Sequence, residues 1–256
     1  DSANVKYQWL RDGTPINHAT QDRYTLTNDD LGHKISVKAT YEDNGKHAES
    51  PVSAETEVPK DATPPQGNFH DDFSAYPAGS EYAEGSTFGE WKVMHSGYGH
   101  VKVVDNGSGN NVLELKPKAQ SGQHETSSTE VIGPEHGSDF TFSGTISTPE
   151  QLRQGATPNA WETGWLVWNY TDNDHFYYFV PRADGWELGK RDPAYKGGQR
   201  FIASGSEGWP LADAKNFSIS KHGNTVEVKI NGKVVTTITD DDNAYSGNGR
   251  VGIYSE

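Results

Sequence analysis

The chain of 256 residues contains no cysteine, so disulfide bonds, thiolate metal sites and cysteine nucleophiles are all excluded. Cationic residues are scarce as well, because 22 Lys and Arg stand against 36 Asp and Glu, for a net charge of −14. Phosphate binding needs clustered Lys and Arg, so this charge argues against nucleic acid and anionic membranes as partners. The surplus of carboxylates instead suits oxygen ligation of hard cations such as Ca²⁺.

Long apolar runs are also missing, so the sequence predicts neither a signal peptide nor a membrane-inserted segment. Hydrophobic residues make up 32% of the chain, and 28 glycines with 13 prolines indicate many turns. Short β-strands joined by tight turns fit this composition, and long helices do not. The chain starts abruptly at Asp1 and stops at Glu256 after a strand-like run. We interpret it as a monomeric fragment of a larger protein.

Tryptophan, by contrast, is abundant, and four of the seven lie between Trp161 and Trp186. In that stretch, aromatic side chains are interleaved with Glu, Asp, His, Arg and Lys. Aromatic faces beside polar groups suit sugar rings, which present C–H patches on one side and hydroxyls around the edge. The alternative is that these tryptophans are large core residues, since Trp is highly buried on average. We predict a ligand-facing position for one or two of the four.

The first 58 residues predict a compact β-module. Strands are expected at Lys6–Leu10, Arg23–Leu26, Lys34–Tyr41 and Ala54–Val58, with a hairpin turn at Asp43-Asn44-Gly45. The stretches YQWLRDGTPI and YTLTNDDLGHKISVKATYEDNGKHAES resemble the immunoglobulin-like repeat of bacterial surface adhesins and other large secreted proteins. The resemblance implies a spacer domain with Trp9 in its core, in a secreted or bacterial cell-surface protein.

Three prolines between Pro59 and Pro65 predict a semi-rigid linker over residues 59–68. From residue 69 to 256, we expect a second domain made of about a dozen short strands in a sandwich of two antiparallel sheets. One short helix is expected at residues 148–155, with Thr148 as N-cap and Gln151 completing a capping box. The clearest strands are Trp91–His95, Val101–Val104, Val112–Lys116, Phe140–Ile146, Thr163–Tyr170, His175–Pro181, Trp186–Lys190, Arg200–Ala203, Phe217–Lys221, Thr225–Ile230, Lys233–Thr239 and Arg250–Tyr254.

Several stretches of this second domain resemble the concanavalin A-like, or laminin G-like, jelly-roll superfamily. They are DDF, WETGWLVWNYTDNDHFYYFV, GWELGKRDP, NTVEVKINGKVV and the terminal GRVGIYSE. The resemblance implies an all-β chain, with a small immunoglobulin-like sandwich followed by a larger jelly-roll sandwich, and a glycan ligand. It does not choose between binding and cleavage, because the superfamily includes lectins, carbohydrate-binding modules, glycoside hydrolases and polysaccharide lyases.

Strand alternation divides the aromatic residues between two faces. In the first strand, Glu162, Leu166, Trp168 and Tyr170 oppose Trp161, Trp165 and Val167, and in the second, Phe176, Tyr178, Val180 and Arg182 oppose His175, Tyr177 and Phe179. We favour a ligand face holding ionisable groups that are costly to bury without partners, made of Glu162, Trp168, Tyr178 and Arg182. A structural Glu162–Arg182 ion pair is the alternative.

The segment that follows adds further candidate ligand-binding residues. Arg and Lys beside aromatic rings suit an acidic sugar, because guanidinium forms bidentate bonds to carboxylate. The alternative is a solvated rim. The candidates are Trp186, Lys190, Tyr195 and Arg200. Around the glycines of HSGYGH, His95, Tyr98 and His100 could also border a site.

Two acidic stretches predict a structural calcium ion. Asp71 and Asp72 precede the first strand of the second domain, and Asp240 and Asp242 belong to the run DDDN. In the resembled jelly-roll domains, the first and last strands run side by side and a Ca²⁺ ion often bridges them. Carboxylate oxygens are the ligands that this ion prefers. The alternative is a polar turn with solvated carboxylates.

Cleavage of a polysaccharide is the alternative function. A retaining glycosidase of the resembled fold carries two glutamates on one face, in a spacing such as E-x-D-x-x-E that does not occur here. A lyase needs converging Arg, Gln or Asn, His and Tyr side chains, for which the candidates are Gln123 with His124, and Tyr178 or Tyr195 with Arg182 or Arg200. We predict no catalytic residue and favour a lectin-like region of an adhesin that binds polysaccharide or cell-surface glycan. A structural domain with a protein partner is the third possibility.

Overall fold

The computed structural model describes residues 5–16, 19–22, 24, 30, 32–42, 46–58, 69–122 and 125–256. Internal contacts divide the chain into two compact units, Asp1–Phe69 and His70–Glu256. The predicted linker at 59–68 lies outside the described residues. Over the described ranges, no helix has the length and apolar character needed to cross a membrane.

The first unit contains one small antiparallel sheet with the order β2-β1-β3-β4, in which β5 also pairs with β3. Its strands confirm the expectations for Lys6–Leu10 and Lys34–Tyr41. The half-buried Trp9 ring stacks on Tyr24 at 5.6 Å between centroids. Most of the predicted strand at 23–26 and the turn at 43–45 lie outside the described residues. The strands are β1 (Lys6–Arg11), β2 (Thr14–Pro15), β3 (Lys34–Glu42), β4 (Ala48–Glu49) and β5 (Thr56–Glu57).

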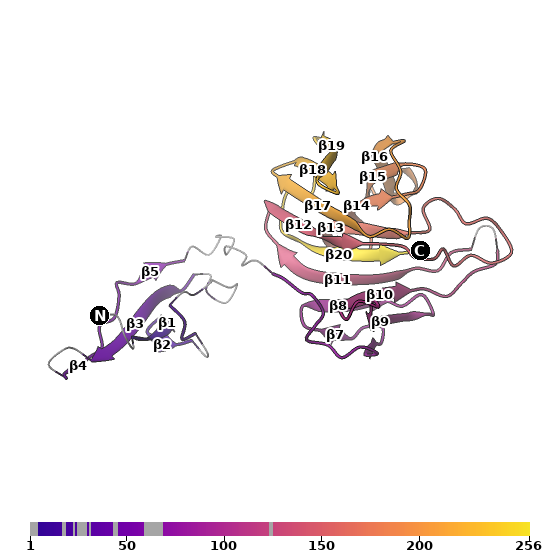
Figure 1. Ribbon diagram of the computed structural model, residues 1–256. Coiled ribbons are helices and arrows are strands. Elements are labelled where there is room, and N and C mark those ends of the chain that lie inside the picture. The colour runs from indigo at the N-terminus through magenta and orange to yellow at the C-terminus, as the bar shows by residue number, and fades with distance from the viewer. Residues whose placement is uncertain are drawn as a thin grey trace. The chain divides into compact units, whose positions relative to one another are not determined.

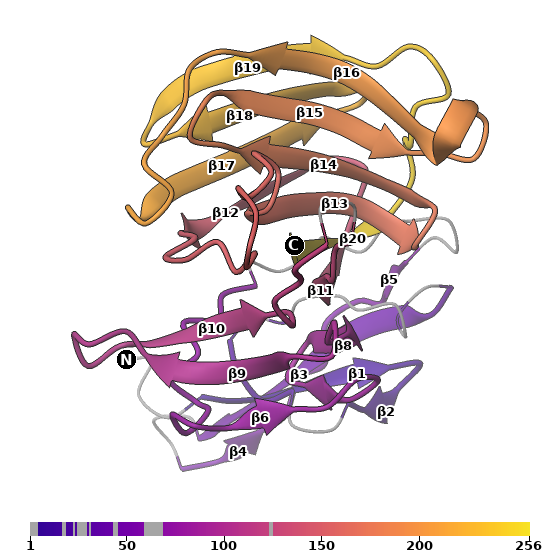
Figure 2. The same cartoon turned by 90° about the vertical axis from the view of Figure 1, so that its right-hand side faces the viewer.

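The second unit is built from three sheets (Figures 1 and 2). An eight-stranded sheet has the order β16-β15-β14-β13-β20-β11-β8-β7, a four-stranded sheet has the order β12-β17-β18-β19, and a three-stranded sheet has the order β10-β9-β6. Their strands are β6 (Glu81–Tyr82), β7 (Thr87–Phe88), β8 (Trp91–His95), β9 (His100–Asp105), β10 (Asn111–Lys116), β11 (Thr129–His136), β12 (Phe140–Ile146), β13 (Gly164–Asp172), β14 (His175–Pro181), β15 (Trp186–Arg191), β16 (Gln199–Gly205), β17 (Lys215–His222), β18 (Thr225–Ile230), β19 (Lys233–Thr239) and β20 (Gly249–Ser255).

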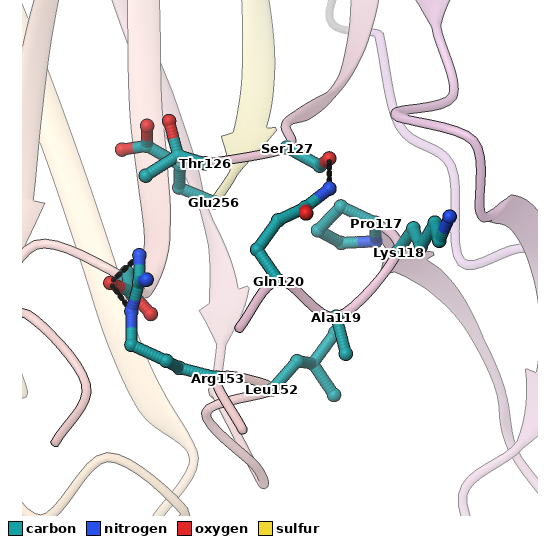
Figure 3. Close-up of a pocket in the computed structure, with 10 residues that line it drawn as sticks. Pro117, Lys118, Ala119, Gln120, Thr126, Ser127, Leu152, Arg153 and Glu256 are labelled. Atoms are coloured by element: carbon teal, nitrogen blue, oxygen red, sulfur yellow. Dashed lines mark hydrogen bonds and ion pairs between the residues drawn. The ribbon is translucent and has the colours of Figure 1, made fainter. Parts of the chain in front are cut away.

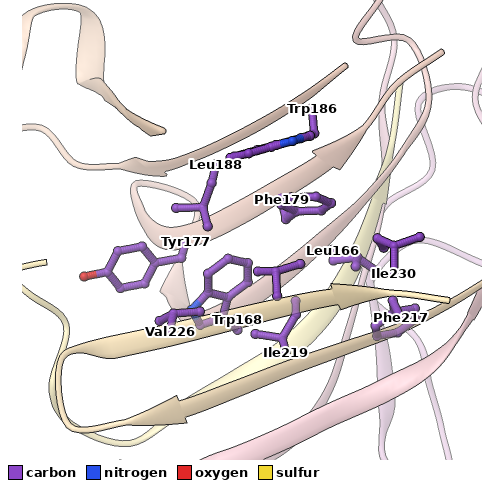
Figure 4. Close-up of a cluster of buried hydrophobic side chains, with 11 residues drawn as sticks. Leu166, Trp168, Tyr177, Phe179, Trp186, Leu188, Phe217, Ile219, Val226 and Ile230 are labelled. Carbon is purple, nitrogen blue, oxygen red and sulfur yellow. The ribbon is translucent and has the colours of Figure 1, made fainter. Parts of the chain in front are cut away.

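One face of the eight-stranded sheet, the inner face, packs on the four-stranded sheet through alternating apolar side chains. Figure 4 shows this core, which includes Leu166, Trp168, Phe179, Ile219 and Val226. A second core near β8 and β11 joins the sheet to β9 and β10, and Ile253 of β20 packs on both cores. The described chain is thus almost wholly β, and the predicted all-β class with a large sandwich is confirmed.

The opposite face, the outer face, carries its own cluster of side chains. Val167 and Tyr178 are fully buried there, whereas Met94, Trp165 and Tyr254 are half-buried and pack against them. Every predicted strand of this unit forms. The limits of five of them, β8, β12, β14, β18 and β19, agree with the predicted ranges to the residue.

Strand β11 was not predicted, because its sequence TEVIGPEH contains a Gly-Pro pair that is typical of turns. In the structure, Pro134 lies where the β11–β20 register shifts, between Ile132 and Glu135, a position that tolerates the missing donor. Gly133 is required by a close approach, since a Cβ there would lie 2.7 Å from the Trp91 ring. The pair therefore marks an irregularity within a strand and not its end.

The predicted helix at 148–155 is wrong, because this segment has no regular secondary structure. Its polar side chains form hydrogen bonds to β13 and to the residues just before β13. Within the described part of the chain, they do not cap the backbone of their own segment. Thr148 Oγ1 accepts a hydrogen bond from Gly164 N at 3.0 Å, and Gln151 Nε2 donates to the carbonyl oxygens of Asn159 and Glu162, each at 3.1 Å. Side-chain hydrogen bonds of this kind compete with helix formation.

Strand alternation in β13 holds only as far as Trp168. Asn169 adopts a left-handed conformation (φ 49°), and the register to both neighbouring strands shifts there. Because the bulge adds one residue, Tyr170 turns to the outer face and stacks on Phe176 at 5.9 Å. The expectation that Tyr170 shares a face with Trp168 is therefore wrong.

Candidate functional site

The structure splits the predicted ligand face. Trp168 is fully buried on the inner face, where it stacks on Tyr177, whereas Tyr178 belongs to the outer face. Trp186 is also an inner core residue and stacks on Phe179 at 5.7 Å. The expectation that Trp168 and Tyr178 form one surface is wrong, because adjacent paired strands place residues 168 and 177 opposite each other. Trp168 and Trp186 are core residues.

Glu162 and Arg182 do not pair with each other. Glu162 is buried and bonds to Arg153, with 2.7 Å between Arg153 Nη2 and Glu162 Oε1 (Figure 3). Arg182 bonds instead to Asp184 and Glu187. Arg153 also donates to the carbonyl oxygens of Gly122 and Glu125. Its side chain borders a cavity of about 20 Å³. A cavity of this size holds about one water molecule, so it cannot take a sugar ring.

Five predicted residues gather in one place together with Tyr177. We call this group the Asp240 cluster, and its predicted members are Lys190, Tyr195, Arg200, Asp240 and Asp242. The Lys190 side chain is fully buried, and its Nζ donates to Asp240 Oδ2 at 2.9 Å and to the carbonyl oxygens of Asp242 and Asn243. The same ammonium lies within 5.7 Å of the ring centroids of Tyr177, Tyr195 and Tyr245. Lys190 is therefore no solvated rim residue.

Asp240 is fully engaged by this cluster. Its Oδ2 also accepts from the Tyr177 hydroxyl at 2.6 Å, and its Oδ1 accepts from Arg200 at 2.7 Å. Burial alone would raise the pKa of Asp240, but the hydrogen bonds from Tyr177 and Lys190 outweigh it and hold the pKa below its ordinary value. The cluster thus fixes the 240–243 turn against β15 and β16, and both carboxylate oxygens of Asp240 are occupied within it.

Asp240 does not fit the predicted calcium site. Both carboxylate oxygens of Asp240 face cationic or phenolic donors, which a Ca²⁺ ion would have to displace. Asp71 accepts hydrogen bonds from Trp91 Nε1 and Phe73 N, and Asp72 accepts one from Ser74 N. Within the described part of the chain, no three acidic or histidine side chains gather as a metal site. The calcium ion itself stays a prediction.

The outer face brings together aromatic rings that are partly open to solvent. The centroid of the half-buried Trp165 ring lies 4.9 Å from that of Tyr254 and 5.1 Å from that of Tyr178. Gln199 Nε2 donates to the Tyr178 hydroxyl, which orients this group at the base of the cluster. Phe201, 65% exposed, and Arg191 lie on the neighbouring strands β16 and β15. Trp161, 41% exposed, accepts a hydrogen bond from Trp165 Nε1 through its carbonyl. This surface offers flat apolar rings beside polar groups.

Three polar side chains adjoin Tyr254 on the same face: His95, Ser128 and Glu130. His95 Nε2 lies 3.1 Å from Ser128 Oγ, and His95 Nδ1 lies 3.7 Å from Glu130 Oε2. Glu130 is 2% exposed, and its Oε1 has no hydrogen-bond partner among the described residues. Burial raises the pKa of Glu130 to about 7 and lowers the pKa of His95. We call these three residues the Glu130 site.

Sequence reasoning missed most of this surface. His95 was a candidate, but Trp165 was assigned to the less favoured face, and Ser128, Glu130 and Tyr254 were not considered. The available signal was the alternation in STEVI, which places Ser128 and Glu130 on one face of a strand. The Gly-Pro pair concealed that strand. Gln123 and His124, the lyase candidates, lie outside the described residues.

Comparison with known proteins gives similarity of fold only. No protein-family model and no curated protein sequence matches the chain. Carbohydrate-binding module CBM66 from Bacillus subtilis matches with a TM-score of 0.44 and 14% identity, over 64% of this chain and 86% of the other. A GH16 protein of the Bacteroides ovatus mixed linkage glucan PUL, in complex with its G4G4G3G product, matches at 0.46 and 11%, over 72% and 83%. Domain 4 of AbnA, an extracellular GH43 arabinanase from Geobacillus stearothermophilus, matches at 0.36 and 15%, over 61% and 76%.

Proposed function

We propose that the outer face of the eight-stranded sheet binds a glycan and that the chain is a lectin-like part of a bacterial surface or secreted adhesin. One observation carries the proposal: the half-buried rings of Trp165 and Tyr254, 4.9 Å apart, lie on a sheet face that also presents His95, Arg191 and Gln199. Aromatic rings contribute large apolar area at low entropic cost, and the polar groups orient a hydroxylated ligand.

The same face weakens two forms of the cleavage alternative. A glycosidase needs two carboxyl groups across the bond that breaks, whereas the buried Glu130 has an imidazole, His95, as its neighbour. A uronate lyase must neutralise the carboxylate of the sugar. The buried Glu130 beside His95 would instead repel a sugar carboxylate that bound at this place. Binding therefore remains the better-supported function of the aromatic residues.

Glycan-array screening followed by calorimetry on the best ligand tests this proposal. Trp165→Ala should weaken binding at least about tenfold, because it removes a central aromatic anchor. Tyr41→Ala is the matched control, since Tyr41 is an exposed aromatic residue of the first unit (38%). Thermal unfolding of each variant verifies the fold. Equal affinities of wild type and Trp165→Ala, or no binding to any glycan of the array, would refute the proposal.

A further inference from the structure

Ser128, His95 and Glu130 are aligned in the order hydroxyl, imidazole and carboxyl. The β-ladder produces this order, because residues 128 and 130 are two apart and so share a face, and His95 is the direct partner of Glu130 on β8. The distances are 3.1 Å from Ser128 Oγ to His95 Nε2 and 3.7 Å from His95 Nδ1 to Glu130 Oε2. Nucleophile, general base and orienting acid stand in this sequence in serine hydrolases, and they are recognised by geometry and not by chain order.

We propose that Ser128 and His95, oriented by Glu130, hydrolyse O-acyl esters carried by the bound sugar. The sugar part of this substrate class rests on the glycan binding proposed above for the outer face, whereas the acyl-transfer chemistry rests on the three side chains alone. Glycan binding and ester hydrolysis can therefore be tested separately.

Ester hydrolysis needs a nucleophile and a base that solvent and substrate can reach, and an orienting acid that is buried beneath them. Ser128 is half-buried and 30% of the His95 side chain is exposed, so the nucleophile and base can meet a substrate on the outer face. The Glu130 carboxyl is sealed beneath them, 2% exposed. Among the described residues its Oε1 accepts no hydrogen bond, so no structural donor holds this oxygen. Glu162, by contrast, is held by Arg153.

Further features of the site bear on the chemistry. The Tyr254 ring lies 6.2 Å from the His95 ring, centroid to centroid, so an aromatic side chain borders the imidazole on the outer face. Burial lowers the pKa of His95, which keeps the imidazole neutral and able to accept a proton. Gly97 lets its loop approach closely, since a Cβ there would lie 2.4 Å from the Ser128 carbonyl oxygen. The Ser128 backbone therefore lies directly against Gly97.

The reaction has two balanced halves. Ser128 Oγ attacks the ester carbonyl carbon while its proton passes to His95 Nε2, and the Nδ1–H of the imidazolium faces the Glu130 carboxylate. As the tetrahedral intermediate collapses, the bond from the acyl carbon to the sugar oxygen breaks and His95 gives its proton to that oxygen. A water molecule, deprotonated by His95, then attacks the acyl–Ser128 ester, which releases the carboxylic acid and restores the Ser128 hydroxyl.

Ester hydrolysis by the full chain provides the test. The probes are p-nitrophenyl acetate, an O-acetylated xylan with acetate release as the readout, and a fluorophosphonate label located by mass spectrometry. Ser128→Ala should lower kcat/KM at least about 1000-fold and abolish the label. Ser127→Ala is the matched control, because the Ser127 hydroxyl bonds to Gln120 and not to His95. Its activity should equal that of wild type.

Glu130 is a positioning residue, so its variant needs a readout that a structural role would not move. Glu130→Gln preserves shape and should lower kcat about 100-fold with KM unchanged, because the amide cannot compensate the imidazolium charge. A higher KM together with a lower melting temperature would indicate a structural role and would overturn this part of the proposal.

The outcomes separate this inference from glycan binding. If folded wild type hydrolyses neither ester and Ser128 takes no label, or if Ser128→Ala retains activity, the acyl-transfer site is refuted, whatever Trp165→Ala does to binding. If p-nitrophenyl acetate is cleaved with dependence on Ser128 but the xylan ester is not, the triad stands and the xylan ester is refuted as a substrate. Cleavage of both probes with dependence on Ser128 supports the whole proposal.

Discussion

Two buried carboxylates of the second unit, Asp240 and Glu130, have opposite surroundings although they are built from similar parts. Each lies near tyrosine side chains and nitrogen-containing side chains, and each is 2% exposed. Asp240 accepts hydrogen bonds from Tyr177, Lys190 and Arg200, so both of its oxygens are occupied. Glu130 has a histidine at 3.7 Å and, within the described ranges, no donor to Oε1.

The difference suits different roles, a structural one for Asp240 and the proposed chemical one for Glu130. A buried ion is tolerated when every lone pair is satisfied, and the Asp240 cluster meets this condition. Burial lowers stability when a carboxyl lacks such partners, and proteins retain such groups chiefly where they carry chemistry. Of the two residues, sequence reasoning chose Asp240 for a ligand, whereas the contacts favour Glu130.

Breaking the Asp240 cluster should give the largest effect. Asp240→Asn removes the counter-charge of a fully buried ammonium, and removal of one partner from a buried pair costs about 3–5 kcal/mol. The free energy of unfolding, followed by tryptophan fluorescence in urea, should fall by this amount. Asp241→Asn is the matched control, because Asp241 is exposed and adjacent. Equal stability of the two variants would mean that the cluster contributes nothing to the fold.

Removing the Glu130 carboxyl should stabilise the protein at neutral and alkaline pH. Burial raises the pKa of Glu130 from 4.5 to about 7, so the folded state keeps a proton that the unfolded state releases, and stability falls as pH rises through this window. The free energy of unfolding of Glu130→Gln should match that of wild type at pH 4 and exceed it by about 3 kcal/mol at pH 8. Glu135→Gln, at an exposed neighbouring position, should show no such trend.

His136 contributes to the pH dependence of the free energy of unfolding with the opposite sign to Glu130. Burial lowers its pKa from 6.5 to about 4, so stability falls as pH decreases through that range. Between about pH 4.5 and 6.5, the two groups offset each other in wild type, and Glu130→Gln should expose the slope due to His136. A variant that is more stable and yet less active would show that Glu130 serves function at the expense of stability. A pH-independent difference would contradict the burial of an ionisable Glu130.

The fold of the second unit could be predicted from sequence to a large extent. Periodic apolar residues and the Asn231-Gly232 turn determine strands such as β14, β18 and β19 locally. The expectations that failed depend on contacts distant in sequence. Gly133 of β11 is explained by the Trp91 ring and Pro134 by the register shift against β20. The polar residues at 148–155 bond to β13 and the residues before it.

The candidate site could be predicted only in part, because the packing of the second sheet and the pairing of distant strands decide it. Alternation separates Trp165 from Trp168 correctly, but it cannot say which face is covered by a second sheet. That choice depends on the packing of β17 and β18 against Trp168. The neighbours of Glu130 come from β8 and β20, and such pairings are not readable from the periodicity of β11 alone. Lys190 likewise meets Asp240 across fifty residues of chain.

Adding or removing calcium should have the smallest effect on stability. The measurement tests whether the Asp240 cluster is a closed ion-pair network. Since Lys190, Tyr177 and Arg200 occupy both oxygens of Asp240, we expect neither added Ca²⁺ nor EDTA to change the stability difference between wild type and Asp240→Asn. Urea unfolding with the ion and with the chelator measures this. A midpoint that rises with Ca²⁺ in wild type but not in Asp240→Asn would show that the ion displaces Lys190, and the cluster would then be a metal site in its apo form. A rise that Asp72→Asn alone abolishes would place the ion near the first strand and leave the Asp240 cluster a closed internal network.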